Sequence, residues 1–153
     1  YLNYSTLSVS YFVLGRYEQA LEVIDALLDT EKFPAMNNFR ASARLMQLAI
    51  HLEMSHDEML EYVVLSASRY IKSREFDYEF EMMFLKYFVK LAKTFDSRER
   101  LELYQEMKAS LEHLAEASPN EKAGLANFNF LAWLDAKTSG RPLKEVYHPY
   151  QRH

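Results

Sequence analysis

Apolar residues recur at intervals of three and four positions along nearly the whole chain, which is the period of an amphipathic α-helix. The predicted helices cover residues 2–14, 17–28, 37–54, 56–72, 77–94, 96–117, 118–138 and 142–147. Residues 75–81 alternate apolar and acidic side chains as a strand would, but the apolar positions after them continue at helical spacing, so we predict a helix there too. The pattern predicts an all-α protein with a single domain over residues 1–153.

Turn and capping residues fall between the predicted helices. Gly15 stands where the chain reverses and Gly140 where the seventh helix ends, because glycine adopts positive φ without steric cost. Residues 55–58 read Ser-His-Asp-Glu and fit a capping box at the start of the fourth helix. Residues 96–99 and 118–121 likewise begin with a capping residue and carry a Glu soon after, so we expect helices to start there.

Composition agrees with this pattern and narrows the function. Only three Gly and four Pro occur, which leaves few turns between long elements. The net charge is −4 and the charges are mixed, which argues against a nucleic-acid binder. The absence of Cys excludes disulfides and thiolate chemistry and fits a cytoplasmic location. No run of eighteen apolar residues occurs, so we expect no membrane span. Helical character already near Tyr1 indicates a piece of a longer protein.

The first two helices carry aromatic and small residues in an order similar to the tetratricopeptide repeat, namely Tyr4, Leu7, Tyr11, Leu14, Gly15, Tyr17 and Ala20. Ala20 lets the two helices approach closely. The later pairs depart from this order, since Met54 and Met59 stand in the places of Gly15 and Ala20, and the spacing is roughly 40 residues against about 34 in the family. The resemblance implies a right-handed α-α superhelix of about seven helices in three and a half antiparallel pairs, plus a short C-terminal helix.

The resemblance also implies a function, because members of this family bind a peptide or a partner helix in a concave groove. The first helix of each pair lines that groove. Carried onto this sequence, the expected partner-binding residues are Phe12, Arg44, His51, Lys86, Lys93, Asn127, Phe130 and Lys137, with Ser5, Val9, Leu48, Val89 and Leu134 between them. Lys86, Lys90 and Lys93 recur at helical spacing, which is typical of a solvated helix face; the functional alternative is a contact for an acidic partner through Lys86 and Lys93.

Two clusters invite a metal or cation site, and we interpret both as structural. His51 and His56 are five residues apart, about 140° around a helix, whereas a zinc pair needs both rings on one face. The acids at residues 75–81 lack the Gly that a calcium loop requires and suit a helix start. No nucleophile-and-base arrangement or phosphate loop is present, so we expect neither an enzyme nor a cofactor.

Three functions stay open from the sequence. A scaffold or adaptor domain that binds another protein agrees best with the resemblance. A sensory or regulatory domain that controls an attached signalling or transcription module is the alternative, with homodimerisation through the exposed end of the array as its mechanism. An enzyme with an active site between helices is the third and would require a buried titratable cluster in a deep pocket.

Overall fold

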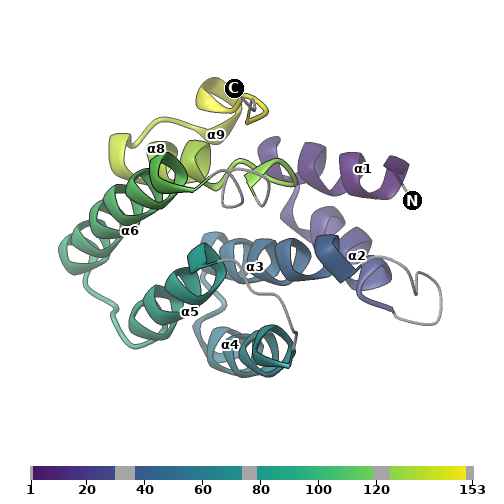
Figure 1. Cartoon of the computed structure of the whole chain (residues 1–153), viewed down its shortest axis with the longest axis horizontal. Coiled ribbons are helices and arrows are strands. Elements are labelled where there is room, and N and C mark those ends of the chain that lie inside the picture. The colour runs from purple at the N-terminus through teal and green to yellow at the C-terminus, as the bar shows by residue number, and fades with distance from the viewer. Residues whose placement is uncertain (1, 30–36, 74–78, 119–124, 151–153) are drawn as a thin grey trace.

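The computed structural model describes residues 2–29, 37–73, 79–118 and 125–150. Its helices are α1 (Leu2–Val13), α2 (Tyr17–Leu27), α3 (Asn37–Glu53), α4 (Asp57–Lys72), α5 (Glu79–Ala92), α6 (Ser97–Ala117), α8 (Phe130–Ser139) and the short α9 (Leu143–Val146). Consecutive helices pack as antiparallel-like pairs (Figure 1). The predicted all-α fold, with seven long helices and a short last one, is therefore confirmed for the described residues.

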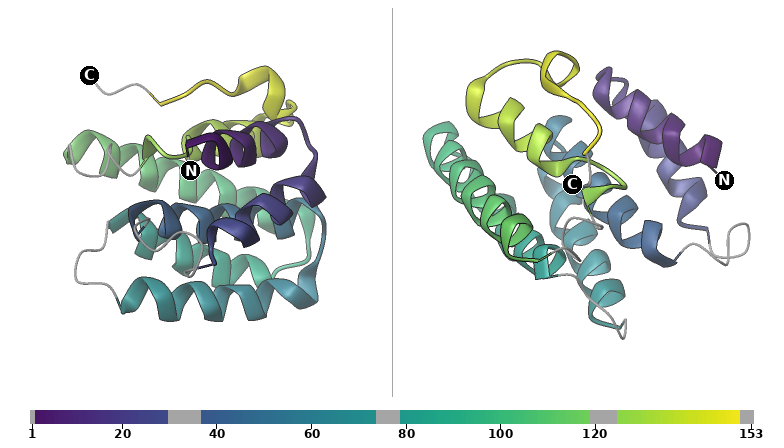
Figure 2. Two further views of the ribbon diagram at one scale, coloured as in Figure 1. Left: turned by 90° about the vertical axis from the view of Figure 1, so that its right-hand side faces the viewer. Right: turned by 45° about the horizontal axis from the view of Figure 1, so that its top comes forward.

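The helix pairs follow one another around a curved array in which α3 lies near the centre (Figure 1). α3 packs against α2 on one side and against α4 on the other, and it also contacts α5. The chain then turns back, so that the C-terminal segment comes near α1 (Figure 2). Tyr147 and Pro149 of that segment line one hollow together with Val9 of α1. The two ends of the described array therefore approach each other.

At three predicted helix boundaries, the structure shows the backbone conformation or the capping bond that the sequence indicated. Gly15 has a φ of 76° in the turn between α1 and α2, a conformation that L side chains rarely adopt. Asp96 is the N-cap of α6, and its Oδ1 accepts a hydrogen bond of 3.0 Å from the backbone N–H of Glu99. Gly140 ends α8 in the left-handed conformation with a φ of 76°.

The capping box predicted at residues 55–58 is wrong. Ser55 has a φ of 56° and belongs to the turn, while His56 is the N-cap of α4 and makes no side-chain capping bond. A non-glycine residue in this left-handed region is strained, and here the turn between α3 and α4 holds it in place.

The predicted continuous seventh helix is also wrong. Leu125 is helical, residues 126–128 form a turn, and α8 begins only at Phe130. The Asn129 side chain explains this break, because its Oδ1 accepts from the backbone N–H of Ala132 at 3.2 Å and so caps α8. Ser118 ends α6 in an extended conformation. The expected cap at residues 118–121 otherwise lies outside the described residues, as does the expected start of the fifth helix at 77–78.

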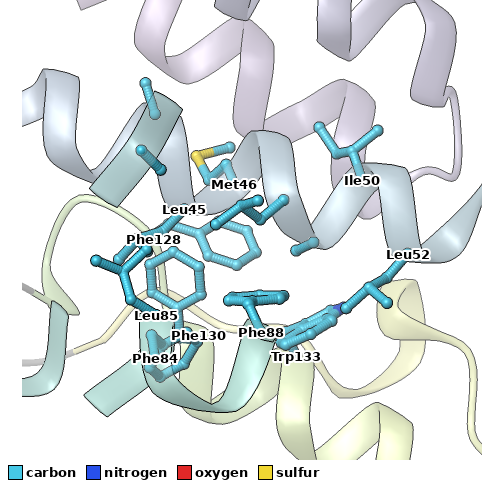
Figure 3. Close-up of a cluster of buried hydrophobic side chains, with 14 of the residues drawn as sticks. Leu45, Met46, Ile50, Leu52, Phe84, Leu85, Phe88, Phe128, Phe130 and Trp133 are labelled. Carbon is cyan, nitrogen blue, oxygen red and sulfur yellow. The ribbon is translucent and has the colours of Figure 1, made fainter. Parts of the chain in front are cut away.

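Aromatic and aliphatic side chains fill the centre of the molecule. Phe84 and Phe88 of α5 face Leu45 of α3, and Phe130 and Trp133 of α8 join the same cluster (Figure 3). The Phe84 and Phe130 rings meet edge to face with centroids 4.9 Å apart, and Phe88 stacks on Trp133 at 6.1 Å. Pairs of this kind contribute about 0.5–1.5 kcal/mol beyond the area they bury.

Candidate interaction surface

The first helices of the three leading pairs are predicted to line an open groove, but the chain itself covers much of that side of them. Phe12 of α1 meets Phe128 edge to face with centroids 5.0 Å apart. The Asn127 Nδ2 donates to the Ser42 Oγ of α3 at 3.2 Å. Phe130 packs on α5 through Phe84. We call this covered side of α1, α3 and α5 the inner face, and residues 125–134 occupy it.

A polar anchor holds α8 against the inner face. The Glu53 Oε1, at the end of α3, accepts from the Trp133 Nε1 at 3.0 Å and pairs with the Lys137 Nζ at 3.0 Å. The Lys137 Nζ also lies 5.3 Å from the centroid of the Tyr104 ring. Burial, and then the charge of Glu53 and a hydrogen bond to it, raise the pKa of Tyr17 to about 12. These groups satisfy one another, so Lys137 is part of the scaffold.

The eight predicted partner-binding residues consequently separate into four places. Phe12 is 1% exposed and Phe130 is 0% exposed, so neither side chain lies open to solvent as a groove lining would, although Phe12 borders a hollow of about 310 Å³. The physical reason is that packing Phe128 and Phe130 on the inner face removes its apolar surface from water, which lowers the free energy. The structure places Phe12 and Phe130 in the core, Asn127 and Lys137 at the anchors of the inner face, Arg44 and His51 in a cleft on the opposite side of α3, and Lys86 and Lys93 on the surface of α5 and of the turn that follows it.

The basic stripe of α5 is exposed to solvent. Lys86 is exposed on the side of α5 away from the buried Phe84 and Phe88, and Lys93 is exposed in the turn directly after α5. The Lys90 Nζ sits 5.3 Å from the centroid of the Tyr87 ring, so one lysine of the stripe makes a cation–π contact within its own helix. Neither Lys86 nor Lys93 lines the cleft that contains Arg44 and His51.

A cleft of about 260 Å³ opens between α2, α3 and α4. We call it the outer cleft. α3 forms its floor with Arg44, Gln47 and His51, which recur at helical spacing and so lie on one face. Its walls come from α2 and α4 and are lined by Leu21, Asp25, Leu28, Met59, Tyr62, Val63 and Ser66.

Arg44 lies at one end of this floor and is half-buried. Its Nη1 donates to the Ser66 Oγ at 3.1 Å, and its guanidinium carbon lies 4.7 Å from the centroid of the Tyr70 ring. Its Nε is buried and has no hydrogen-bond partner. Burial lowers the pKa of Arg44, Tyr70 opposes this, and the neighbouring charge of Arg40 lowers it further.

His51 lies two helical turns along, at the other end. Its Nδ1 is 3.3 Å from the Nδ1 of His56, a hydrogen bond in which one ring donates. Burial lowers the pKa of His51, His56 lowers it further, and Asp25 partly opposes both. Asp25 in turn accepts from the Gln47 Nε2 at 3.0 Å, and burial raises its pKa. In the described parts of the chain, no group of three or more His, Cys, Asp or Glu side chains is arranged to hold a metal ion.

The walls of the outer cleft expose large side chains that the sequence analysis did not select. Tyr62 is 69% exposed and Met59 is 49% exposed, and they lie one turn apart on α4. Tyrosine supplies a rigid contact with a polar tip and methionine an adaptable one, and such residues recur in protein interfaces. One feature of the sequence indicated Met59: when the first helix pair is aligned with the second, Met59 takes the position of the small Ala20.

A larger hollow of about 650 Å³ lies between α1 and the C-terminal segment. Its described lining is mostly apolar and hydroxylic, from Ser5, Thr6, Val9, Ser10, Val13, Leu14, Phe39, Ala126, Asn127, Tyr147 and Pro149. It includes two positions, Ser5 and Val9, from the groove lining expected from the sequence. Its floor is the seam where residues 126–127 meet α1.

No helix in the described ranges is both long enough and apolar enough to span a bilayer. Neither a protein-family model nor a curated protein or solved structure matches this sequence. The candidate site is therefore argued from this chain alone.

Proposed function

We propose that this chain is a tetratricopeptide-like interaction module that binds a segment of another protein, and that the outer cleft is the binding surface. The resemblance of the first helix pair and the paired helical architecture both support an interaction module. The proposal moves the binding surface from the inner face to the opposite side of α3, because residues 125–134 already occupy the inner face.

The observation that carries this proposal is the combination of groups in the outer cleft. Two large side chains, Tyr62 and Met59, stand exposed beside a half-buried guanidinium, Arg44, whose Nε has no partner. Interface hot spots are enriched in Tyr and Arg and lie in well-desolvated pockets. A partner that covers Tyr62 and Met59 removes apolar area from water and shields the polar floor.

The dimensions of the cleft indicate how a partner binds. A volume of about 260 Å³ is smaller than the usual pocket of roughly 300–1,000 Å³ for a drug-sized ligand. The distance from Arg44 to His51 along α3 is about 10 Å at 1.5 Å per residue. A partner helix or extended peptide therefore lies across the rim and inserts one or two side chains.

Peptides selected from a random twelve-residue library displayed on phage, with the whole chain as target, test this proposal. Tyr62→Ala is expected to weaken the selected peptides by about 30-fold, in line with about 2 kcal/mol for a hot-spot residue. Leu65→Ala is the matched control, because Leu65 is 57% exposed on the same helix and does not line the cleft. Titration calorimetry measures both affinities. Equal affinity for the two variants overturns the proposal.

A further inference from the structure

The guanidinium of Arg44 is incompletely satisfied by its own chain. Among the described residues it donates one hydrogen bond, from Nη1 to the neutral Ser66 hydroxyl, and it lies over the face of Tyr70. Its Nε is buried without a partner, and no carboxylate of the described chain pairs with it. Buried guanidinium groups are normally matched by a carboxylate, since an arginine fork fits two carboxylate oxygens.

Among the described residues that line the outer cleft, the one carboxylate serves other groups. Asp25 accepts from Gln47, which lies about one helical turn from Arg44 along α3, and its charge acts on His51. Its negative charge disfavours a doubly charged anion such as a phosphate in the same small cleft. A single carboxylate at the Arg44 end meets less repulsion and matches the single guanidinium there.

We propose that the partner segment presents an Asp or Glu side chain to Arg44, with an adjacent apolar side chain against Met59 and Tyr62. This inference rests on the proposed function and specifies the partner's chemistry. The buried Nε has no bond to lose. A rotation of the guanidinium that offers two of its nitrogens to a carboxylate therefore gives up the bond to the neutral Ser66 hydroxyl and the contact with the Tyr70 ring, and a charged pair replaces them. The partner thus supplies the negative charge that Arg44 lacks among the described residues of its own chain.

The selected peptides test the inference through a double-mutant cycle between peptide and protein. Changing the peptide's Asp to Asn, or its Glu to Gln, is expected to weaken binding to the wild-type chain at least tenfold. The same change is expected to cost less than twofold against Arg44→Gln. Fluorescence anisotropy of labelled peptides measures all four affinities.

Ser66→Glu provides a second, independent test, because it supplies a carboxylate to Arg44 from within the chain. This variant is expected to raise the melting temperature and to weaken the acidic peptides at least tenfold. Ser68→Glu is the matched control, since Ser68 is half-buried on the same helix and does not line the cleft. It adds the same charge and is expected to leave affinity within twofold.

The outcomes separate the inference from the proposed function. The inference is overturned if the selected peptides lack an acidic residue, or if removing their acid weakens binding equally to the wild type and to Arg44→Gln. In either case the proposed function still stands if binding depends on Tyr62. A library that yields no peptide dependent on Tyr62 overturns the proposed function and the inference together.

Discussion

The two opposite sides of α3 differ in what covers them. On the inner face, Ser42 and Glu53 anchor residues 127 and 133, and the space between them is packed with aromatic rings (Figure 3). On the outer side, Arg44 and His51 form a polar floor that the walls of α2 and α4 leave open. The comparison teaches that a helical array which folds its last helices onto its inner face can still leave a polar cleft accessible on its outer side.

α3 contributes side chains to both the inner face and the outer cleft, because residues two positions apart in a helix point about 200° apart. Ser42 and Arg44 are two residues apart and point in opposite directions, as the 3.6-residue period requires. Apolar residues such as Leu45 and Leu48, at 0% exposure, fill the remaining directions. α3 is therefore a core helix on which one polar stripe stays accessible.

The largest expected effect comes from the inner face. Phe130→Ala removes a fully buried ring that packs on Phe80, Phe84 and Phe128, and it is expected to lower the free energy of unfolding by about 3–5 kcal/mol. Urea denaturation followed by circular dichroism measures this in one cooperative transition. A loss below about 1 kcal/mol would mean that residues 125–134 are a displaceable occupant, and the inner face would return as a binding groove.

The anchor at Glu53 has the next largest effect. Glu53→Gln keeps an acceptor for Trp133 but loses the charge that pairs with Lys137, so we expect stability to fall by about 1–2 kcal/mol. Glu112→Gln is the matched control, because that carboxylate is half exposed and 3.9 Å from Lys108. It is expected to change stability by less than about 0.5 kcal/mol. If thermal melts show equal losses of stability for the two variants, Glu53 is not an anchor for α8.

The outer side contributes a pH dependence through His51. Its pKa in the folded chain is below the unfolded value of about 6.5, because burial and His56 disfavour its charged form more than Asp25 favours it. Well above pH 6.5 the ring is neutral in both the folded and the unfolded chain, so its ionisation does not affect stability there. Stability falls as pH drops from 6.5 through the folded pKa, by at most about 1.4 kcal/mol per pH unit for one proton.

Melting temperatures between pH 5 and 8 measure this dependence. His51→Asn is expected to flatten the profile, whereas the exposed His113 on α6 provides the control variant His113→Asn, which is expected to keep it. A wild-type profile that rises toward pH 5 would contradict the sign argued here.

The smallest effect is expected on α5. Reversing the charges of Lys86 and Lys93 to Glu is expected to weaken acidic peptides only two- to threefold, because these exposed lysines do not line the outer cleft and act through screened long-range attraction. Raising the salt from 0.05 to 0.5 M is expected to abolish the difference. A loss of tenfold or more that survives high salt would move the binding surface to α5.

The local sequence determined where most helices lie. Gly15, Gly140 and Asp96 set their boundaries through backbone freedom or a single side-chain hydrogen bond. The same reasoning gave wrong predictions at Ser55 and at Asn129, for different reasons. Ser55 is held in a turn by the packing of α3 on α4, and Asn129 caps a helix inside a segment whose apolar pattern had indicated continuous helix.

The tertiary structure alone decided which surfaces stay open. Helical periodicity identifies an apolar stripe, and the family resemblance assigned Phe12 and Phe130 of that stripe to a groove, whereas the structure buries both side chains. It cannot say whether a distant segment will cover that stripe, since the contact between Ser42 and Asn127 joins residues 85 positions apart. The sequence by itself therefore fixed the helices and their apolar faces. Only the return of residues 125–134 onto α1, α3 and α5 decided that the inner face is covered while Arg44 and His51, on the opposite side, lie together in a cleft.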